Sequence, residues 1–128
     1  MKKRILLVDD EKSFTNLLKI NLEETGHYEV RVENWAEDAF AAARQFKPDL
    51  ILLDIIMPRM PGGNVAAQIK EDPELKDTPI VLLTAAVRKH QVEENEGIIC
   101  GFPCLAKPVP VETIIEAIEK HARSVKEA

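Results

Sequence analysis

Four apolar runs of the chain lead into side chains that are able to do chemistry. These side chains are Asp9 and Asp10 after residues 5–8, Asp54 after residues 50–53, Thr84 after residues 80–83, and Lys107 beyond residues 98–105. Each run has the length and aliphatic character of a strand. If the strands are parallel and adjacent, their carboxyl ends meet at one edge of the sheet, where α/β proteins bind ligands.

A pocket built from these residues would favour phosphoryl chemistry. Clustered carboxylates raise one another's pKa unless a cation is present, and Mg²⁺ is the hard cation that such oxygen ligands suit. A lysine ammonium and a threonine hydroxyl facing a Mg²⁺-bound carboxylate suit positioning and charge neutralisation at a phosphoryl group. One carboxylate would then act as the nucleophile and form an aspartyl phosphate.

Each residue also has an ordinary structural interpretation. The Asp-Asp pair could cap a helix, Thr84 could cap another, and Lys107 could be a solvated surface lysine. Asp54 could start a loop, although it ends a run of buried aliphatic residues, where an unpaired charge is unfavourable. Their joint placement at four strand ends favours the pocket over four unrelated surface roles.

The intervening residues predict helices between the strands. Strands are expected at residues 5–8, 28–32, 50–53, 80–83 and 98–105; helical apolar spacing covers 14–22, 36–43, 65–69 and 111–125, with a weaker, mobile or short helix at 87–96. This βαβαβαβαβα order predicts a doubly wound α/β fold with a parallel five-stranded sheet and five helices. A capping box of Asn34 and Glu37 is expected at the start of the second helix.

Length and composition limit the class of protein. A chain of 128 residues fits one domain, 1–128, and its net charge of −5 gives no support to direct nucleic-acid binding. No apolar stretch reaches membrane-spanning length and no secretory signal is visible, so we expect a cytoplasmic protein without membrane contact. Cys100 and Cys104 are expected to be buried, reduced thiols, since neither a disulfide nor a zinc site fits their spacing.

The motifs together resemble the receiver domain of two-component response regulators, over essentially the whole chain. The matching segments are Val8-Asp9-Asp10-Glu11, then Leu53-Asp54-Ile55-Ile56-Met57-Pro58-Arg59-Met60-Pro61-Gly62, then Leu83-Thr84-Ala85, and finally Lys107-Pro108. The Asp-x-x-Met-Pro segment is the most specific of the four. The resemblance implies the CheY-like, flavodoxin-like fold with strand order 2-1-3-4-5.

The resemblance also implies a role for each site residue. Asp54 would be the phospho-acceptor, and Asp9, Asp10, Asp54 and the backbone carbonyl of Ile56 would hold Mg²⁺ as the cofactor. Thr84 and Lys107 would contact the phosphoryl oxygens, and the Lys107–Pro108 bond is expected to be cis. The donor would be a sensor histidine kinase or a histidine phosphotransfer protein.

Two departures from the family pattern bear on switching and on turnover. The position three before the lysine, usually aromatic, is Cys104 here, which puts the usual coupling between threonine and aromatic residue in doubt. Phe102, two residues before Cys104, would point to the same face of the strand as Cys104, and it is the ring that could substitute for the missing aromatic residue. Ile56 and Ala86 stand where the family tunes dephosphorylation, and neither can orient a water, so slow self-dephosphorylation is expected.

These inferences predict a signalling switch rather than a turnover enzyme. The resemblance implies that a downstream protein would bind through the fourth helix, the fifth strand and the last helix. No effector follows, so we expect a stand-alone receiver or a piece of a longer regulator. Two alternatives remain: a receiver-like adaptor that is never phosphorylated, and an aspartyl-phosphate-type phosphatase, which Ile56 disfavours because that class usually has a second Asp there.

Overall fold

A computed structural model describes residues 2–55, 57, 62–84, 98–99 and 102–122. The elements, in chain order, are β1 Lys3–Val8, α1 Lys12–Glu24, β2 Tyr28–Glu33, α2 Ala36–Phe46, β3 Leu50–Asp54, α3 Gly62–Glu71, β4 Ile80–Thr84, β5 Ile98–Ile99, β6 Phe102–Ala106 and α5 Val111–His121. The expected helix at 87–96 lies outside the described residues.

The sheet confirms the predicted strand order. Its strands run β2-β1-β3-β4-β6-β5, and the first five pair in parallel. The difference lies in the segment predicted as one strand over 98–105. Residues 98–99 form β5, which pairs antiparallel with β6, so β6 takes the place of the fifth parallel strand. Pro103 of β6 has no N–H to donate, which suits a position near the sheet edge.

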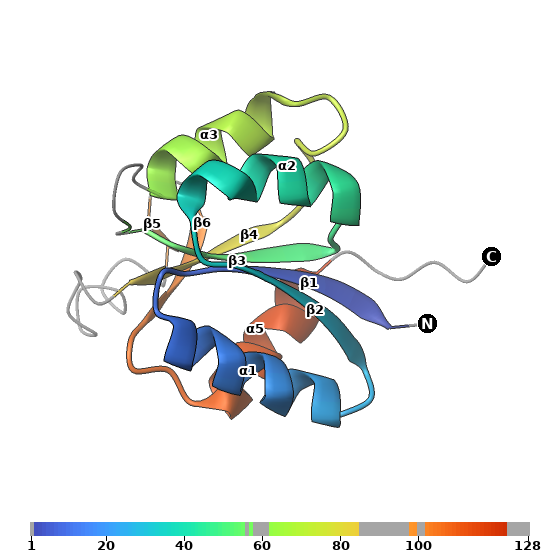
Figure 1. Cartoon of the computed structure of the whole chain (residues 1–128), viewed down its shortest axis with the longest axis vertical. Coiled ribbons are helices and arrows are strands. Elements are labelled where there is room, and N and C mark those ends of the chain that lie inside the picture. Colours follow the sequence, from blue (N-terminus) through green and yellow to red (C-terminus); the bar gives the residue numbers. More distant parts are fainter. Residues whose placement is uncertain (1, 56, 58–61, 85–97, 100–101, 123–128) are drawn as a thin grey trace.

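Helices cover both faces of the sheet. In Figure 1, α2 and α3 lie on one side of the sheet and α1 and α5 on the other. Alternate residues of β3 belong to two hydrophobic clusters: Ile51 and Leu53 pack with the α2 side, and Leu50 and Leu52 with the α1 side. All four are fully buried. Burial on both faces explains why the strand is continuously aliphatic.

Two local predictions for the helices were wrong. The helical apolar spacing predicted over residues 14–22 includes Leu17, but Leu17 is 61% exposed, because the buried face of α1 follows Thr15, Leu18 and Leu22 instead. The predicted capping box is also absent. Trp35 is the N-cap of α2 and makes no side-chain cap hydrogen bond, and the side-chain amide of Asn34 donates to the backbone carbonyl of Asp9.

A cluster of polar side chains joins α5 to strands β1 and β2. The Tyr28 hydroxyl donates to Glu119 Oε2 at 2.6 Å, and Lys3 Nζ donates to Glu119 Oε1 at 2.9 Å. The hydrogen bond from Tyr28, followed by that from Lys3, lowers the pKa of the Glu119 carboxyl. Burial of the Tyr28 side chain, followed by its hydrogen bond to Glu119, raises the pKa of Tyr28.

We expect Tyr28→Phe to lower the free energy of unfolding by about 1 kcal/mol, because it removes a hydrogen bond to a charged but half-exposed carboxylate. Since the pKa of Glu119 is lower in the folded chain, this contribution is present above the ordinary carboxyl pKa and is lost as pH falls through the folded value. Urea unfolding at pH 7 and at pH 3 would test it: the difference between wild type and variant should shrink at pH 3. An equal difference at both pH values would contradict the assignment.

Candidate functional site

The strand ends bring the predicted site residues together. Val8 lies opposite Leu53 in the register of β1 and β3, Asp54 opposite Leu83, and Thr84 opposite Ala106. The carboxyl ends of the four strands therefore stand level. Lys107 follows β6 directly, and its backbone N–H donates to the Thr84 carbonyl at 2.9 Å.

Three carboxylates converge at this edge. Side-chain oxygens of Asp9, Asp10 and Asp54 all lie within 4.8 Å of one another. Asp9 is fully buried and Asp54 is 5% exposed, whereas Asp10 is exposed. An all-oxygen set of this kind, buried on one side and open on the other, suits a hard divalent cation that keeps some of its waters. The residues present therefore fit Mg²⁺.

Lys107 lies between the buried carboxylates. Its Nζ is 2.6 Å from Asp9 Oδ2, 3.2 Å from Glu11 Oε1 and 3.7 Å from Asp54 Oδ2. Burial lowers the pKa of the ammonium, but the hydrogen bond to Asp9, the charges of Asp9 and Asp54 and the hydrogen bond to Glu11 outweigh it and raise the pKa overall. Lys107 therefore carries a full positive charge at neutral pH.

Asp9 is held on several sides. Burial raises the pKa of its carboxyl above the ordinary value, although hydrogen bonds from Lys107 and from the Glu11 backbone N–H, 3.0 Å from Oδ1, lower it in part. The side-chain amide of Asn34 donates to the Asp9 backbone carbonyl at 2.8 Å and to Thr15 Oγ1 at 3.0 Å. The loop after β1 is thus fixed both to α1 and to the residue after β2.

Asn34 is a site-supporting residue that sequence reasoning missed. Its position before a helix resembled a cap, and nothing in the local sequence indicates a bond to a loop 25 residues earlier. We expect Asn34→Ala to lower the free energy of unfolding by about 1–2 kcal/mol, because it leaves the Asp9 carbonyl without this donor. Asn64→Ala, at an exposed position of α3, is the matched control. Equal urea midpoints for the two variants would contradict this role.

The position three before Lys107, which is usually aromatic in the family that the sequence resembles, holds a buried cysteine. Cys104 is 3% exposed, lies opposite Leu82 in the sheet and belongs to the cluster on the α2 side. Burial raises the pKa of its thiol to about 11, so it stays protonated at neutral pH. Cys104 is thus a buried free thiol, as predicted, whereas Cys100 lies outside the described residues.

Phe102 shares the face of Cys104, as the two-residue strand period predicted. Both pack with the same hydrophobic cluster. The ring of Phe102 lies 5.8 Å from Lys70 Nζ, and this amine donates to the backbone carbonyls of Lys76 and Thr78. Phe102 is therefore packed toward the end of α3 in this structure.

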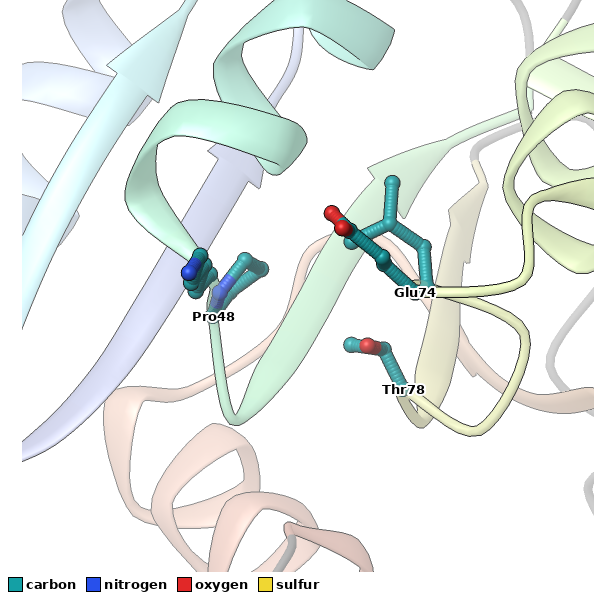
Figure 2. A pocket seen from close by; sticks show the side chains of 5 residues that line it. Pro48, Glu74 and Thr78 are labelled. Carbon is teal, nitrogen blue, oxygen red and sulfur yellow. The ribbon is translucent and has the colours of Figure 1, made fainter.

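A separate pocket opens at the opposite end of the sheet. Its volume is about 320 Å³, and it is lined by Lys47, Pro48, Glu74, Leu75 and Thr78. Figure 2 shows Pro48 on one side and Glu74 and Thr78 on the other. Pro48 precedes β3 and Thr78 precedes β4, so the pocket lies at the amino ends of these strands. It is distinct from the carboxylate cluster, which stands at their carboxyl ends.

The Lys107–Pro108 peptide bond is cis, as predicted. Ile56, Ala85 and Ala86 lie outside the described residues, and so does most of the output surface expected from the fourth helix. No helix within the described part of the chain is long and apolar enough to cross a membrane.

Five parallel strands in the order β2-β1-β3-β4-β6, with an acidic cluster and a lysine at their carboxyl ends, form the arrangement of receiver domains. The sequence model of the response regulator receiver domain family matches residues 5–119, and the chain belongs to this family. Members are signalling modules rather than turnover enzymes. They bind Mg²⁺ at an acidic pocket and interact with kinases or phosphotransfer proteins and with downstream targets.

Individual relatives agree with this assignment. The chain is 35% identical to protein PilH of Pseudomonas aeruginosa, covering 90% of this chain and 93% of PilH. It is 32% identical to the polar-differentiation response regulator DivK of Brucella anthropi, covering 94% and 97%. The solved structure of the chemotaxis protein CheY4 of Vibrio cholerae superimposes with a TM-score of 0.79 at 27% identity, covering 94% of this chain and 98% of CheY4. This structural similarity shows that the chain has the CheY-like fold.

Proposed function

We propose that the chain, as a single receiver domain over residues 1–128, accepts a phosphoryl group on Asp54 and thereby switches its protein contacts. The observation that carries the proposal is the position of Lys107. Its ammonium lies within 4 Å of the carboxylates of both Asp9 and Asp54, at the edge where Thr84 also ends its strand. A buried nucleophile, a cation and a hydroxyl at one strand edge suit phosphoryl transfer better than they suit a structural role.

Asp9, Asp10 and Asp54, with the backbone carbonyl of Ile56, would hold the cofactor Mg²⁺. When bound, the cation neutralises charge that builds up on the carboxylates and on the phosphoryl oxygens. The acidic cluster supports this assignment, because its oxygens already lie close together and one of its members, Asp9, has a raised pKa that a cation would lower.

In the transfer step, a carboxylate oxygen of Asp54 would attack the phosphorus of a phosphohistidine on a sensor kinase or a phosphotransfer protein. The new O–P bond forms as the P–N bond breaks, and the imidazole leaves with the bonding electrons and takes up a proton. Lys107 would then pair with one phosphoryl oxygen, and the Thr84 hydroxyl would donate to another. Both residues stand next to Asp54 in the sheet edge, which makes the reach short.

The added charge would shift an existing two-state equilibrium. The surface whose contacts we expect to change with this equilibrium includes β6 and α5, together with the expected helix at 87–96, which lies outside the described residues. Because Cys104 cannot report the swing of an aromatic ring, the switch would depend on Thr84 and Lys107 themselves. We expect slow self-dephosphorylation, since Ile56 and Ala86 have no group that orients water; a phospho-Asp54 lifetime of seconds at neutral pH would contradict this. The predicted cytoplasmic location, without nucleic-acid or membrane contact, stays a prediction.

The proposal is tested by incubating the chain with acetyl phosphate and following its intact mass. With Mg²⁺ we expect one phosphoryl group per chain, and with EDTA in place of Mg²⁺ we expect uptake to fall to background. If neither acetyl phosphate, phosphoramidate nor beryllofluoride changes the mass or the spectrum of the protein, the adaptor alternative stands instead. Steady turnover of phosphate esters would favour the phosphatase alternative.

A further inference from the structure

Phe14 lies against the ammonium group of Lys107. The Nζ atom is 4.8 Å from the centroid of the ring, whereas the other pairs of cation and ring in the described part of the chain are 5.8–5.9 Å apart. The Lys107 side chain is only 11% exposed, so water screens this contact weakly. A cation over an aromatic face gains most when it is removed from water.

The start of α1 fixes the position of the ring. Glu11 is the N-cap, its backbone N–H donates to Asp9 Oδ1, and its carbonyl accepts from the Thr15 N–H at 3.0 Å. Thr15 is fully buried, and its hydroxyl accepts from Asn34. Phe14 precedes Thr15 in this first turn and packs against the hydrophobic cluster on the α1 side of the sheet. The ring therefore lies next to the same hydrogen-bonded segment that holds the acidic loop in place.

A ring holds an ammonium group differently from a carboxylate. It attracts the charge through its face and engages no N–H in a directional hydrogen bond. Lys107 has carboxylate partners in Asp9 and Glu11, and it must reorient its N–H groups when a phosphoryl group arrives on Asp54. The ring would keep Nζ in place during that exchange without competing with the phosphoryl oxygens for its protons.

We infer that Phe14 is a positioning residue for phosphoryl transfer to Asp54, acting by holding the Lys107 ammonium against its ring face. The inference rests on the proposed function, because it assigns Phe14 a role in that reaction. It separates Phe14 from the purely apolar core role that its helical spacing with Leu18 and Leu22 suggests.

The test measures the rate constant of phosphorylation by acetyl phosphate and Mg²⁺. Phe14→Leu keeps an apolar side chain but removes the ring, and we expect the rate constant to fall about fivefold. Phe14→Tyr keeps the ring and should stay within about twofold of wild type. Phe40→Leu, which removes a ring under Arg44 on α2, is the matched control and should leave the rate unchanged.

A second arm separates positioning from general packing. In a Lys107→Ala background, Phe14→Leu should change the remaining rate by less than about twofold, since the group that the ring holds is gone. The inference is overturned if Phe14→Leu reacts at the wild-type rate, if Phe14→Tyr is as slow as Phe14→Leu, or if the fivefold loss persists without Lys107. Failure of the wild type itself to take up phosphate would instead overturn the proposed function.

Discussion

Asp54→Asn is expected to abolish phosphate uptake from acetyl phosphate. The amide retains the shape of the side chain at a position that is 5% exposed, but it has no carboxylate oxygen to attack phosphorus. Because Asn is nearly isosteric and removes one negative charge from a crowded acidic cluster, the free energy of unfolding should change by no more than about 1 kcal/mol. Intact-mass spectrometry measures the uptake, and a thermal melt shows that the variant is folded.

Asp38→Asn is the matched control for this variant. Asp38 is an exposed carboxylate in the first turn of α2, and its substitution should leave both rate and stoichiometry of phosphorylation unchanged. Phosphate uptake by Asp54→Asn at the wild-type rate would mean that another side chain is the acceptor. Loss of uptake in both variants would mean that the effect is not specific to the site.

Lys107→Ala is expected to give the largest loss of stability among single substitutions at the site. It removes the ammonium that lies 2.6 Å from the buried carboxylate of Asp9 and 3.7 Å from that of Asp54, and removing one partner from a buried ion pair typically lowers the free energy of unfolding by about 3 kcal/mol. For a domain of this size, that corresponds to a fall in Tm of roughly 10 °C. Phosphorylation should also slow, because the ammonium group that would pair with an incoming phosphoryl oxygen is gone.

The loss of stability in Lys107→Ala should depend on pH. Without the lysine, the pKa of Asp9, already raised by burial, rises further above its value in the unfolded chain. The folded state then binds a proton more readily than the unfolded state, so stability is retained below the unfolded pKa and is lost as pH rises through the folded pKa. The deficit should therefore be smaller at pH 4 than at pH 7, and Mg²⁺ at pH 7 should recover part of it.

Lys120→Ala removes an exposed lysine near the end of α5 and serves as the control. Its Tm should stay within about 2 °C of wild type at both pH values. If Lys107→Ala melts at the wild-type temperature at pH 7, the ammonium does not compensate the buried carboxylates and the electrostatic account of the site is wrong.

Strand order and site residues were predictable because both depend on short-range patterns. Continuous aliphatic runs such as residues 50–53 occur where both faces of a strand are covered, and the structure buries every residue of β3. Polar residues directly after such runs must lie at the sheet edge. The convergence of Asp9, Asp10 and Asp54 follows from that geometry, once the order 2-1-3-4-5 is assumed.

The contacts that sequence reasoning missed all join distant segments. Asn34 looks like a helix cap from its neighbours, but its amide binds the Asp9 carbonyl across the sheet edge. Phe14 looks like a core residue from its helical spacing, but it also contacts Lys107, 93 positions later. Leu17 fits a helical apolar pattern, and its 61% exposure depends on which face of α1 meets the sheet. Periodicity alone does not contain these long-range pairings.

The central claim is that this chain carries its phosphoryl group on Asp54. The most direct measurement is to phosphorylate the wild type with acetyl phosphate and Mg²⁺, reduce the acyl phosphate with borohydride, and map the resulting homoserine by peptide mass spectrometry. Homoserine is expected at position 54 and at no other aspartate. Homoserine at Asp9 or Asp10, or a phosphate that resists reduction on another side chain, would contradict it.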